Sequence, residues 1–444
     1  MLDAGLEETG STTASDVAVL NTCTVTATAD AEVRQVIRRI HRANPTCRIL
    51  VTGCYAQRAP AEIAGLGGVA WVVGNSHKHA LAEILAGVVP TGRGPVSSDG
   101  SNSGYLERLI ESPPGPAWRE APAPEGGAQV LVGEISEEFH FAPAFPDDRT
   151  RPTLKVQDGC NARCSFCIIP EVRGPSRSLE PAQATEQVRA LHEHGFKEIV
   201  LSGINLGSYG RDLDRRITFL GLLEKILAET SIARLRLSSI EVMDVSRDLI
   251  RLVAGNSRLA DHFHVPLQSG CDRILRAMNR RYWTTQYAER IHAVRAALPH
   301  AAIGADVMVG FPGETAADHS ASLRFIESLP LTYVHVFPYS QRPGTPAAAR
   351  PGQVEGSIAH ERGREVRATV EEKQQAFLAA QVGRRLAALT LDDRADGAPV
   401  ALTSNYLKVA LPATDVGPNT LLSVGIGRVA GGLLYGYPQP AGLC

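Results

Sequence analysis

The sequence lacks the features that lead a chain to or through a membrane. No Lys or Arg precedes Arg34, and no apolar run approaches the ~18 residues that a membrane span requires. We therefore expect neither a secretory leader nor a transmembrane helix, and we expect a cytoplasmic protein. In a reducing compartment, its eight cysteines are more often metal ligands or small buried residues than disulfide partners.

The sequence also lacks an excess of charge of one sign. The formal net charge is -2 and the pI is near 6.7, which argues against nucleic-acid binding over the whole surface but is compatible with a local basic surface. Residues 149–177 are such a stretch, because they contain six basic residues against two acidic ones. A chain of 444 residues with 44% hydrophobic content can form about three domains with full-sized cores.

Three cysteines stand close together in the basic stretch, namely Cys160, Cys164 and Cys167. A zinc knuckle would need a paired C-x2-C with a second Cys or His pair at a fitting distance, and the following His192 and His194 belong to a helix-like stretch. Three thiolates on one tight loop suit a cubic 4Fe-4S cluster, because soft sulfur donors select iron–sulfur clusters. A missing fourth thiolate leaves one iron open to substrate, so the spacing predicts a reactive cluster.

The first 88 residues alternate strand and helix patterns. Their apolar runs are Val17–Leu20, Ile49–Val51 and Val69–Val73, and residues 33–40 between the first two runs repeat at helical spacing. This βαβ pattern predicts a parallel sheet. Cys23 and Cys54 follow the first two runs, at the edge where open α/β sheets gather their ligands, and should face one another. Cys47 precedes the second run and should be a small buried residue.

The remainder of the chain divides into three parts. Residues 89–150 are rich in Pro, Gly, Ser and Glu, which predicts a linker or insertion without a core of its own. Residues 151–380 alternate strand-like and helix-like runs, with strands at Leu154–Val156, Glu198–Leu201, Arg234–Leu237, His262–Val265, Ala302–Met308 and Tyr333–Phe337. Six such units predict an incomplete (βα)6 barrel, with functional groups at the carboxyl ends of its strands. Short β runs in residues 381–442 predict a small β-barrel.

These features together resemble the radical S-adenosylmethionine methylthiotransferases over nearly the whole chain. Besides the cysteine loop, the matching motifs include Asn21-Thr-Cys23 and Gly53-Cys54-Tyr-Ala-Gln57. The branch that modifies N6-threonylcarbamoyladenosine at position 37 of tRNA is most similar, on the stretches beginning at Val156, Leu201, Leu235 and His335. The resemblance implies an α/β fold: a truncated Rossmann-like methylthiotransferase domain, a radical-SAM barrel and a TRAM-like β-barrel.

The resemblance also implies a reaction. A 4Fe-4S cluster on Cys160, Cys164 and Cys167 would bind S-adenosyl-L-methionine and release a 5′-deoxyadenosyl radical, which removes hydrogen from C2 of adenine. A second 4Fe-4S cluster, with Cys23 and Cys54 as ligands, would supply sulfur, and a second S-adenosylmethionine would supply the methyl group. The implied partners are tRNA, an electron donor such as flavodoxin or ferredoxin, and a sulfur donor, with no membrane.

Other functions remain open. Within the same chemistry they are methylthiolation of isopentenyl-adenosine in tRNA and of an aspartate in a ribosomal protein. A non-catalytic iron–sulfur protein that binds RNA is an alternative of another class. In the family, the first domain opens with a strand and a Gly-Cys turn that provides the third ligand of the second cluster, whereas this sequence begins at Met1-Leu-Asp-Ala-Gly5. Either the natural protein starts further upstream or that cluster is incomplete, and we favour the upstream start because Cys23 and Cys54 are both in place.

The resemblance further suggests residues around S-adenosylmethionine. Phe166 matches an aromatic near the adenine, although core packing explains it equally well. The residues expected at the strand ends are Ser202, Gly203 and Asn205 for the methionine moiety, Ser239 and Glu241 for the ribose, Gln268 with Ser269 in the site, and Gly310 and Gly313 for close backbone approach to the adenosine. Candidates for tRNA phosphates are Arg173, Arg177, Arg273, Arg276, Arg280 and Arg281. His262 and His264 are more typical of core histidines than of ligands, and Cys271 and Cys444 are expected to be inert.

Overall fold

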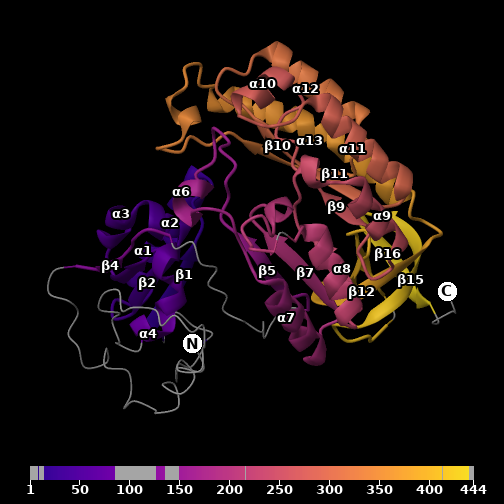
Figure 1. Ribbon diagram of the computed structural model, residues 1–444, viewed down its shortest axis with the longest axis horizontal. Helices are drawn as coiled ribbons and strands as arrows, with labels where there is room; N and C mark the ends of the chain where they lie inside the picture. The colour runs from indigo at the N-terminus through magenta and orange to yellow at the C-terminus, as the bar shows by residue number, and fades with distance from the viewer. Residues whose placement is uncertain are drawn as a thin grey trace. The chain divides into compact units, whose positions relative to one another are not determined.

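The computed structural model describes residues 9, 15–85, 127–135, 150–215, 217–412 and 414–439. Its contacts divide the chain into two compact units, each with its own sheets and core (Figure 1). The first unit comprises residues 1–142 together with 168–174, and the second comprises residues 143–167 together with 175–444. The chain therefore leaves the second unit directly after Cys167 and returns to it at Pro175. Among the described residues, no helix is long and apolar enough to cross a membrane.

The first unit is built on a parallel sheet, as the βαβ pattern predicts. Its strand order is β1-β2-β3-β4, with bounds Val17–Thr22, Arg48–Gly53, Val69–Val73 and Gln129–Leu131. Helix α1 (Ala27–Ala43) begins at an N-cap, Thr26, whose side chain accepts a hydrogen bond from the Ala29 amide. The helix buries Ile37 and Ile40 in the core beside the sheet. The short helices of this unit are α2 (Cys54–Arg58), α3 (Pro60–Ala64), η2 (Asn75–Ala80), α4 (Leu81–Leu85) and α6 (Ile169–Arg173).

Strand β4 lies in the segment predicted as a linker or insertion, and the sequence did not indicate it. Residues Gln129–Leu131 lie within that segment, yet they pair in parallel with Trp71, Val72 and Val73 of β3 and extend the sheet. A strand of only three residues is too short to show a recognisable strand pattern in a sequence rich in Pro and Gly. Residues 86–126 and 136–149 lie outside the described residues, so the prediction is not tested there.

The second unit contains the incomplete barrel, and all six predicted strands are confirmed. Their bounds are β5 Thr153–Asp158, β7 Glu198–Gly203, β8 Arg234–Leu237, β9 His262–His264, β10 Ala302–Val309 and β11 Tyr333–Pro338. Parallel pairing joins β5-β7-β8 and β9-β10-β11, and the bridges Leu235 to Leu259 and Ser239 to His264 connect the two sheets. A short strand, β6 (Arg177–Ser178), pairs antiparallel with β5 and was not expected from the sequence.

Helices follow most of these strands, which is the alternation expected of a βα barrel. Their bounds are α7 Pro181–Glu193, α8 Phe219–Glu229, α9 Arg247–Gly255, α10 Asp272–Ala277, α11 Thr284–Ala297, α12 Ala316–Ser328 and α13 Gly356–Ala379. The sequence did not indicate α10, which is only six residues long. This helix proves important because its carboxyl end contacts the cysteine loop.

The small β-barrel is also confirmed, but it does not form a compact unit of its own. Its strands are β12 Arg385–Ala395, β13 Ala398–Thr403, β14 Lys408–Ala410, β15 Leu421–Ala430 and β16 Leu433–Gln439, closed in the order β12-β13-β14-β16-β15. Figure 1 labels β12, β15 and β16 in yellow tones near the C-terminus. Arg236 of β8 donates hydrogen bonds to the carbonyls of Thr403 and Ser404 at 3.1 and 2.9 Å. The boundary predicted at residue 381 therefore separates the (βα)6 barrel from the small β-barrel, but both belong to one compact unit.

Candidate functional site

The loop that carries Cys160, Cys164 and Cys167 is fixed by the carboxyl end of α10. The Ser165 amide donates to the Met278 carbonyl at 2.9 Å, and Ser165 Oγ donates to the Ala277 carbonyl at 2.8 Å. All three thiols are partly exposed. Three partly exposed cysteines, close in sequence on an anchored loop, match the ligand set of a 4Fe-4S cluster with one open iron.

Gln157 organises the start of this loop, a role that the sequence analysis did not assign. Its side chain is fully buried, and Nε2 donates to the carbonyls of Asp158 and Gly159, each at 2.9 Å, and to Ser176 Oγ at 3.0 Å. Its Oε1 accepts a hydrogen bond from the Asn205 amide at 2.7 Å. A Cβ at Gly203 would lie 2.9 Å from Gln157 Oε1. Gly203 is therefore required by this packing, whatever it contributes to a cofactor.

A buried arginine faces the thiols. Arg280 Nη1 lies 3.2 Å from Cys164 Sγ, and the same guanidinium forms an ion pair with Glu241. Burial raises the pKa of the Cys160 thiol, while a hydrogen bond from the Ala162 amide acts in the opposite direction. Metal coordination deprotonates a thiol outright, so this raised pKa does not oppose a cluster.

The position of Arg280 corrects one sequence prediction. Only 6% of its side chain is exposed, so it is not available to tRNA phosphates. Arg177 is also buried. Of the remaining candidates in the second unit, Arg273, Arg276 and Arg281 are exposed, although Arg273 forms an ion pair with Asp318 and Arg276 stacks on Trp283 at 5.0 Å.

Several predicted cofactor residues have protein partners of their own. Ser239 Oγ lies 2.7 Å from Nδ1 of His264. Phe166 packs against the core cluster of Ile274, Met278, Met308, Phe311 and Ala347, as its packing interpretation predicts. The Gly310 amide donates to Glu314 Oε2 at 2.7 Å, and the Gly313 amide donates to the Gly352 carbonyl at 2.7 Å. These two amides are therefore already used within the protein. Ser202 is the last residue but one of β7 and is partly buried.

Gln268 is the strongest of the predicted cofactor residues outside the cysteine loop. Its φ of 64° is left-handed, which is unusual for a residue other than glycine, Asn or Asp. Its Oε1 is buried and has no hydrogen-bond partner among the described residues. Strain and an unsatisfied buried acceptor at a strand end are typical of a ligand site. The neighbouring Ser269 bonds to the Cys271 amide, so it is used inside the protein.

The first unit brings Cys23 and Cys54 to one sheet edge. Thr22 pairs with Gly53, so the two cysteines follow directly paired positions on adjacent parallel strands. Cys23 is exposed and Cys54 is buried, with Asn75 Nδ2 3.5 Å from Cys54 Sγ. Cys47 is buried at the other end of β2, as predicted. Within residues 15–85, 127–135 and 168–174, no third cysteine follows a strand at this edge.

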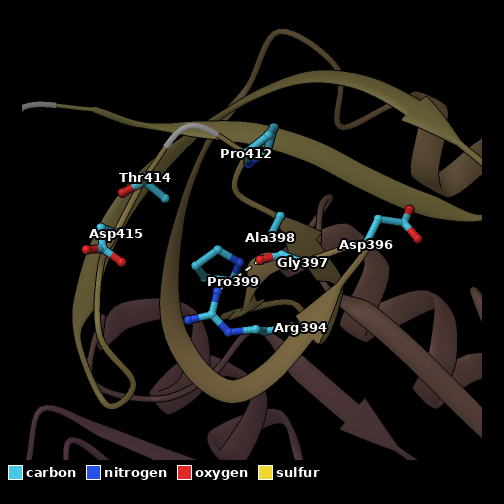
Figure 2. A pocket seen from close by; sticks show the side chains of 8 residues that line it. All are labelled: Arg394, Asp396, Gly397, Ala398, Pro399, Pro412, Thr414 and Asp415. Carbon is cyan, nitrogen blue, oxygen red and sulfur yellow. Dashed lines mark hydrogen bonds between the residues drawn. The ribbon is translucent and has the colours of Figure 1, made fainter.

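A hollow in the β-barrel does not belong to this site. Figure 2 shows its lining residues, Arg394, Asp396, Gly397, Ala398, Pro399, Pro412, Thr414 and Asp415. Arg394 Nη1 donates to the Gly397 carbonyl at 2.9 Å across it. The hollow contains no thiol or imidazole and none of the predicted site residues.

Two protein-family models match this chain, one in its first unit and one in its barrel. Residues 154–326 match the radical SAM superfamily, and residues 1–74 match a family described as uncharacterized protein family UPF0004. Threonylcarbamoyladenosine tRNA methylthiotransferase MtaB of Bacillus subtilis (strain 168) is 35% identical over 99% of this chain and 90% of that protein. The protein of the same name from Aquifex aeolicus (strain VF5) is 36% identical over 89% of this chain and 87% of its own length.

More distant relatives extend the comparison. The tRNA-2-methylthio-N(6)-dimethylallyladenosine synthase of Pelotomaculum thermopropionicum is 32% identical over 81% of this chain and 74% of that protein. The radical S-adenosylmethionine methyltransferase TsrM from Kitasatospora setae, a solved structure with cobalamin and a [4Fe-4S] cluster bound, superposes with a TM-score of 0.50 at 16% identity. This match covers 75% of this chain and 66% of that one and shows a likeness of fold alone. The chain therefore belongs to the radical S-adenosylmethionine methylthiotransferases, enzymes that use a 4Fe-4S cluster and S-adenosylmethionine.

Proposed function

We propose that this enzyme transfers a methylthio group to C2 of N6-threonylcarbamoyladenosine at position 37 of tRNA. The observation that carries the proposal is the clamped loop of Cys160, Cys164 and Cys167 beside Arg280. The choice of nucleoside rests on the names of the relatives that match over 99% and 89% of this chain. Isopentenyl-adenosine is the second candidate, supported by a relative that matches over 81% of the chain.

The cysteines of the loop and the residues around it have different proposed roles. Cys160, Cys164 and Cys167 would hold the cluster, which with S-adenosylmethionine supplies the one-electron chemistry that an unreactive adenine C–H bond requires. Gln157 holds the loop and the Asn205 backbone in one geometry, because its amide bonds to both. Glu241 holds the Arg280 guanidinium against Cys164. Gln268 has a buried acceptor free for a cofactor.

The sulfur-transfer half of the reaction is assigned to the first unit. Cys23 and Cys54 would be ligands of a second 4Fe-4S cluster at the carboxyl edge of the sheet, and this position is the one that open α/β sheets use for ligands. The reaction would further need a sulfur donor and an electron donor such as flavodoxin or ferredoxin.

Separate readouts for the two halves test the proposal. The reduced, reconstituted protein is incubated anaerobically with S-adenosylmethionine and with tRNA that carries N6-threonylcarbamoyladenosine. We expect 5′-deoxyadenosine and the methylthio nucleoside from the wild type, neither from Cys164→Ser, and only 5′-deoxyadenosine from Cys54→Ser. Cys47→Ala, in which a buried thiol away from the sheet edge is changed, is the matched control and should form both products.

Two results would contradict the proposal. Absence of 5′-deoxyadenosine from a fully reconstituted wild type would rule out the radical mechanism. Methylthiolation of tRNA that carries isopentenyl-adenosine, with none of the threonylcarbamoyl substrate modified, would overturn the assigned nucleoside and leave the mechanism in place.

A further inference from the structure

Three potential metal ligands come together on neighbouring strands of the second unit. His264 ends β9, Asp306 lies within β10 and His335 lies within β11. Asp306 pairs directly with His335, and Gly304, two residues before Asp306, pairs with His264. Because side chains two residues apart on a strand share a face, the three side chains lie on one face of the sheet. None of the three is a cysteine-loop residue.

The distances suit a single bound ion. His264 Nε2 and His335 Nδ1 each lie 3.3 Å from the same oxygen, Asp306 Oδ1. One ligand atom from each side chain lies within 4.8 Å of the other two. Metal–nitrogen bonds of about 2.0 Å in a tetrahedral site place neighbouring ligand atoms about 3.3 Å apart. An ion could therefore occupy the centre with small side-chain adjustments and no movement of the strands.

His264 has the features of a prepared ligand. Its Nδ1 lies 2.7 Å from Ser239 Oγ, and its Nε2 is buried and has no hydrogen bond of acceptable geometry with any described residue, despite the nearby Asp306. The residue as a whole is 8% exposed. When Nδ1–H donates to the serine, Nε2 carries the lone pair that a metal needs. Without a metal, this buried nitrogen has no hydrogen-bond partner among the described residues, which is unfavourable for a buried polar atom.

The surroundings also separate this group from ordinary core histidines. His262, on the same strand, uses its Nε2 in a hydrogen bond of 2.7 Å to Tyr333 Oη, and its buried Nδ1 has no partner either, but among the described residues it belongs to no group of three potential metal ligands. The side chain of His335 is 64% exposed. The group is thus closed on the His264 side and open on the His335 side.

We propose that His264, Asp306 and His335 bind one divalent transition-metal ion of the Zn²⁺ or Fe²⁺ class, with Ser239 as the residue that orients His264. Two imidazoles and a carboxylate suit these ions. Three protein ligands leave a coordination position for water or a substrate oxygen on the open side. This site is distinct from the thiolate clusters, and it changes the interpretation of His264 from a core histidine to a ligand.

Zinc binding to the full-length, cluster-loaded protein tests the proposal. After incubation with Zn²⁺ and removal of the unbound ion, the zinc content per chain is measured together with X-ray absorption at the zinc edge. We expect one more zinc per chain in the wild type than in Asp306→Asn or His335→Gln, with nitrogen and oxygen neighbours at about 2.0–2.2 Å. Ser239→Ala should weaken zinc binding by about 10- to 100-fold, because outer partners of a ligating histidine have effects of this size.

Controls separate this site from the cysteines and from misfolding. His292→Gln changes an exposed histidine on α11 and should bind zinc as the wild type does. His335→Gln alters an exposed side chain, so its fold should be retained, and circular dichroism and cluster content check this. Equal zinc contents in the wild type and His335→Gln would overturn the proposal. A zinc spectrum with only sulfur neighbours, at about 2.3 Å, would do the same.

Discussion

At the residue scale, Arg280 is the side chain expected to tune the cluster. It is buried, pairs with Glu241 and lies 3.2 Å from Cys164 Sγ. Because a positive charge stabilises the more negative, reduced cluster, Arg280→Gln should lower the midpoint potential. If Arg280 stabilises the reduced cluster over the oxidised cluster by about 1.4 kcal/mol, its loss lowers the midpoint potential of this one-electron couple by about 60 mV. A redox titration followed by electron paramagnetic resonance measures the shift.

Two further variants show whether the charge itself is responsible. Arg280→Lys keeps the charge and should recover part of the potential. Arg276→Gln removes an exposed arginine that stacks on Trp283, and its potential should equal that of the wild type. If Arg280→Gln has an unchanged potential at full cluster content, Arg280 serves only the packing of the loop.

The sequence predicted the cysteine loop but not the residues that support it, for a physical reason. The three cysteines are close in sequence, so the spacing of Cys160, Cys164 and Cys167 is enough to predict a cluster ligand set. Gln157 bonds to a residue 48 positions away, and Arg280 contacts a thiol 116 positions away. Such partners are determined by how the barrel closes, which no local pattern encodes.

At the scale of elements, Gly53 determines how β1 and β2 end beside Cys54. Its φ is +100°, and a Cβ at this position would lie 2.3 Å from the Thr22 carbonyl oxygen. Gly53→Ala should therefore separate the strand ends and destabilise the first unit by at least about 2 kcal/mol. Hydrogen–deuterium exchange across residues 17–58 measures this loss as faster exchange.

Gly65→Ala is the matched control for this change. Gly65 has a helical φ of -78°, and an added Cβ would have its nearest neighbour at 3.7 Å. Its exchange should be equal to or slower than that of the wild type, because alanine restricts the unfolded chain. Equal exchange in both variants would mean that the strand ends tolerate a displaced Thr22.

A buried ion network joins strands β7 and β8. Glu198 is fully buried and lies 2.7 Å from Arg236 Nε and 3.3 Å from Arg234 Nη1. Burial alone would raise the pKa of Glu198, but Arg236, Arg234 and Arg151 outweigh this and lower it. Glu198→Gln should destabilise the second unit by about 3–5 kcal/mol, because it leaves buried arginines without a counter-charge. Urea unfolding at neutral pH measures the loss.

The same network has a pH signature. A carboxyl group whose pKa is lowered by folding stabilises the fold above its ordinary value of 4.5, and this contribution is lost as the pH falls through the folded pKa. The wild type should therefore lose stability more steeply than Glu198→Gln below pH 4.5. The exposed pair of Lys225 and Glu229 provides the control, since Glu229→Gln should cost at most about 0.5 kcal/mol. Parallel pH curves for the wild type and Glu198→Gln would contradict the assignment.

The element pattern was largely predictable where the strands are regular. All six barrel strands were expected from apolar runs, because buried parallel strands have a strong signal of their own. Strand β4 was missed because its three residues become a strand only by pairing with β3. The two-residue β6 likewise depends on its partner, β5.

At the scale of the whole molecule, the β-barrel packs against the (βα)6 barrel and buries part of it within the second unit. Tyr406 has a left-handed φ of 65°, and its ring stacks on His262 at a centroid distance of 4.4 Å. The guanidinium of Arg236 lies 5.3 Å from the same ring and bonds to the Thr403 and Ser404 carbonyls. Removal of residues 381–444 would expose His262 and leave the buried Arg236 without these acceptors.

We therefore expect a chain truncated after Ala380 to lose structure in the (βα)6 barrel as well as the β-barrel. Limited proteolysis and iron content after reconstitution measure this, and the first unit should remain protected as an internal control. Tyr406→Ala is the milder test, because it keeps the β-barrel and removes only the ring contacts; since Tyr406 is 40% exposed, the change should destabilise the second unit by about 1 kcal/mol. A truncated protein with wild-type protease resistance and iron content on Cys160, Cys164 and Cys167 would mean that the barrel is self-sufficient. In that case the β-barrel would be an appended module, whose removal changes only what the enzyme binds.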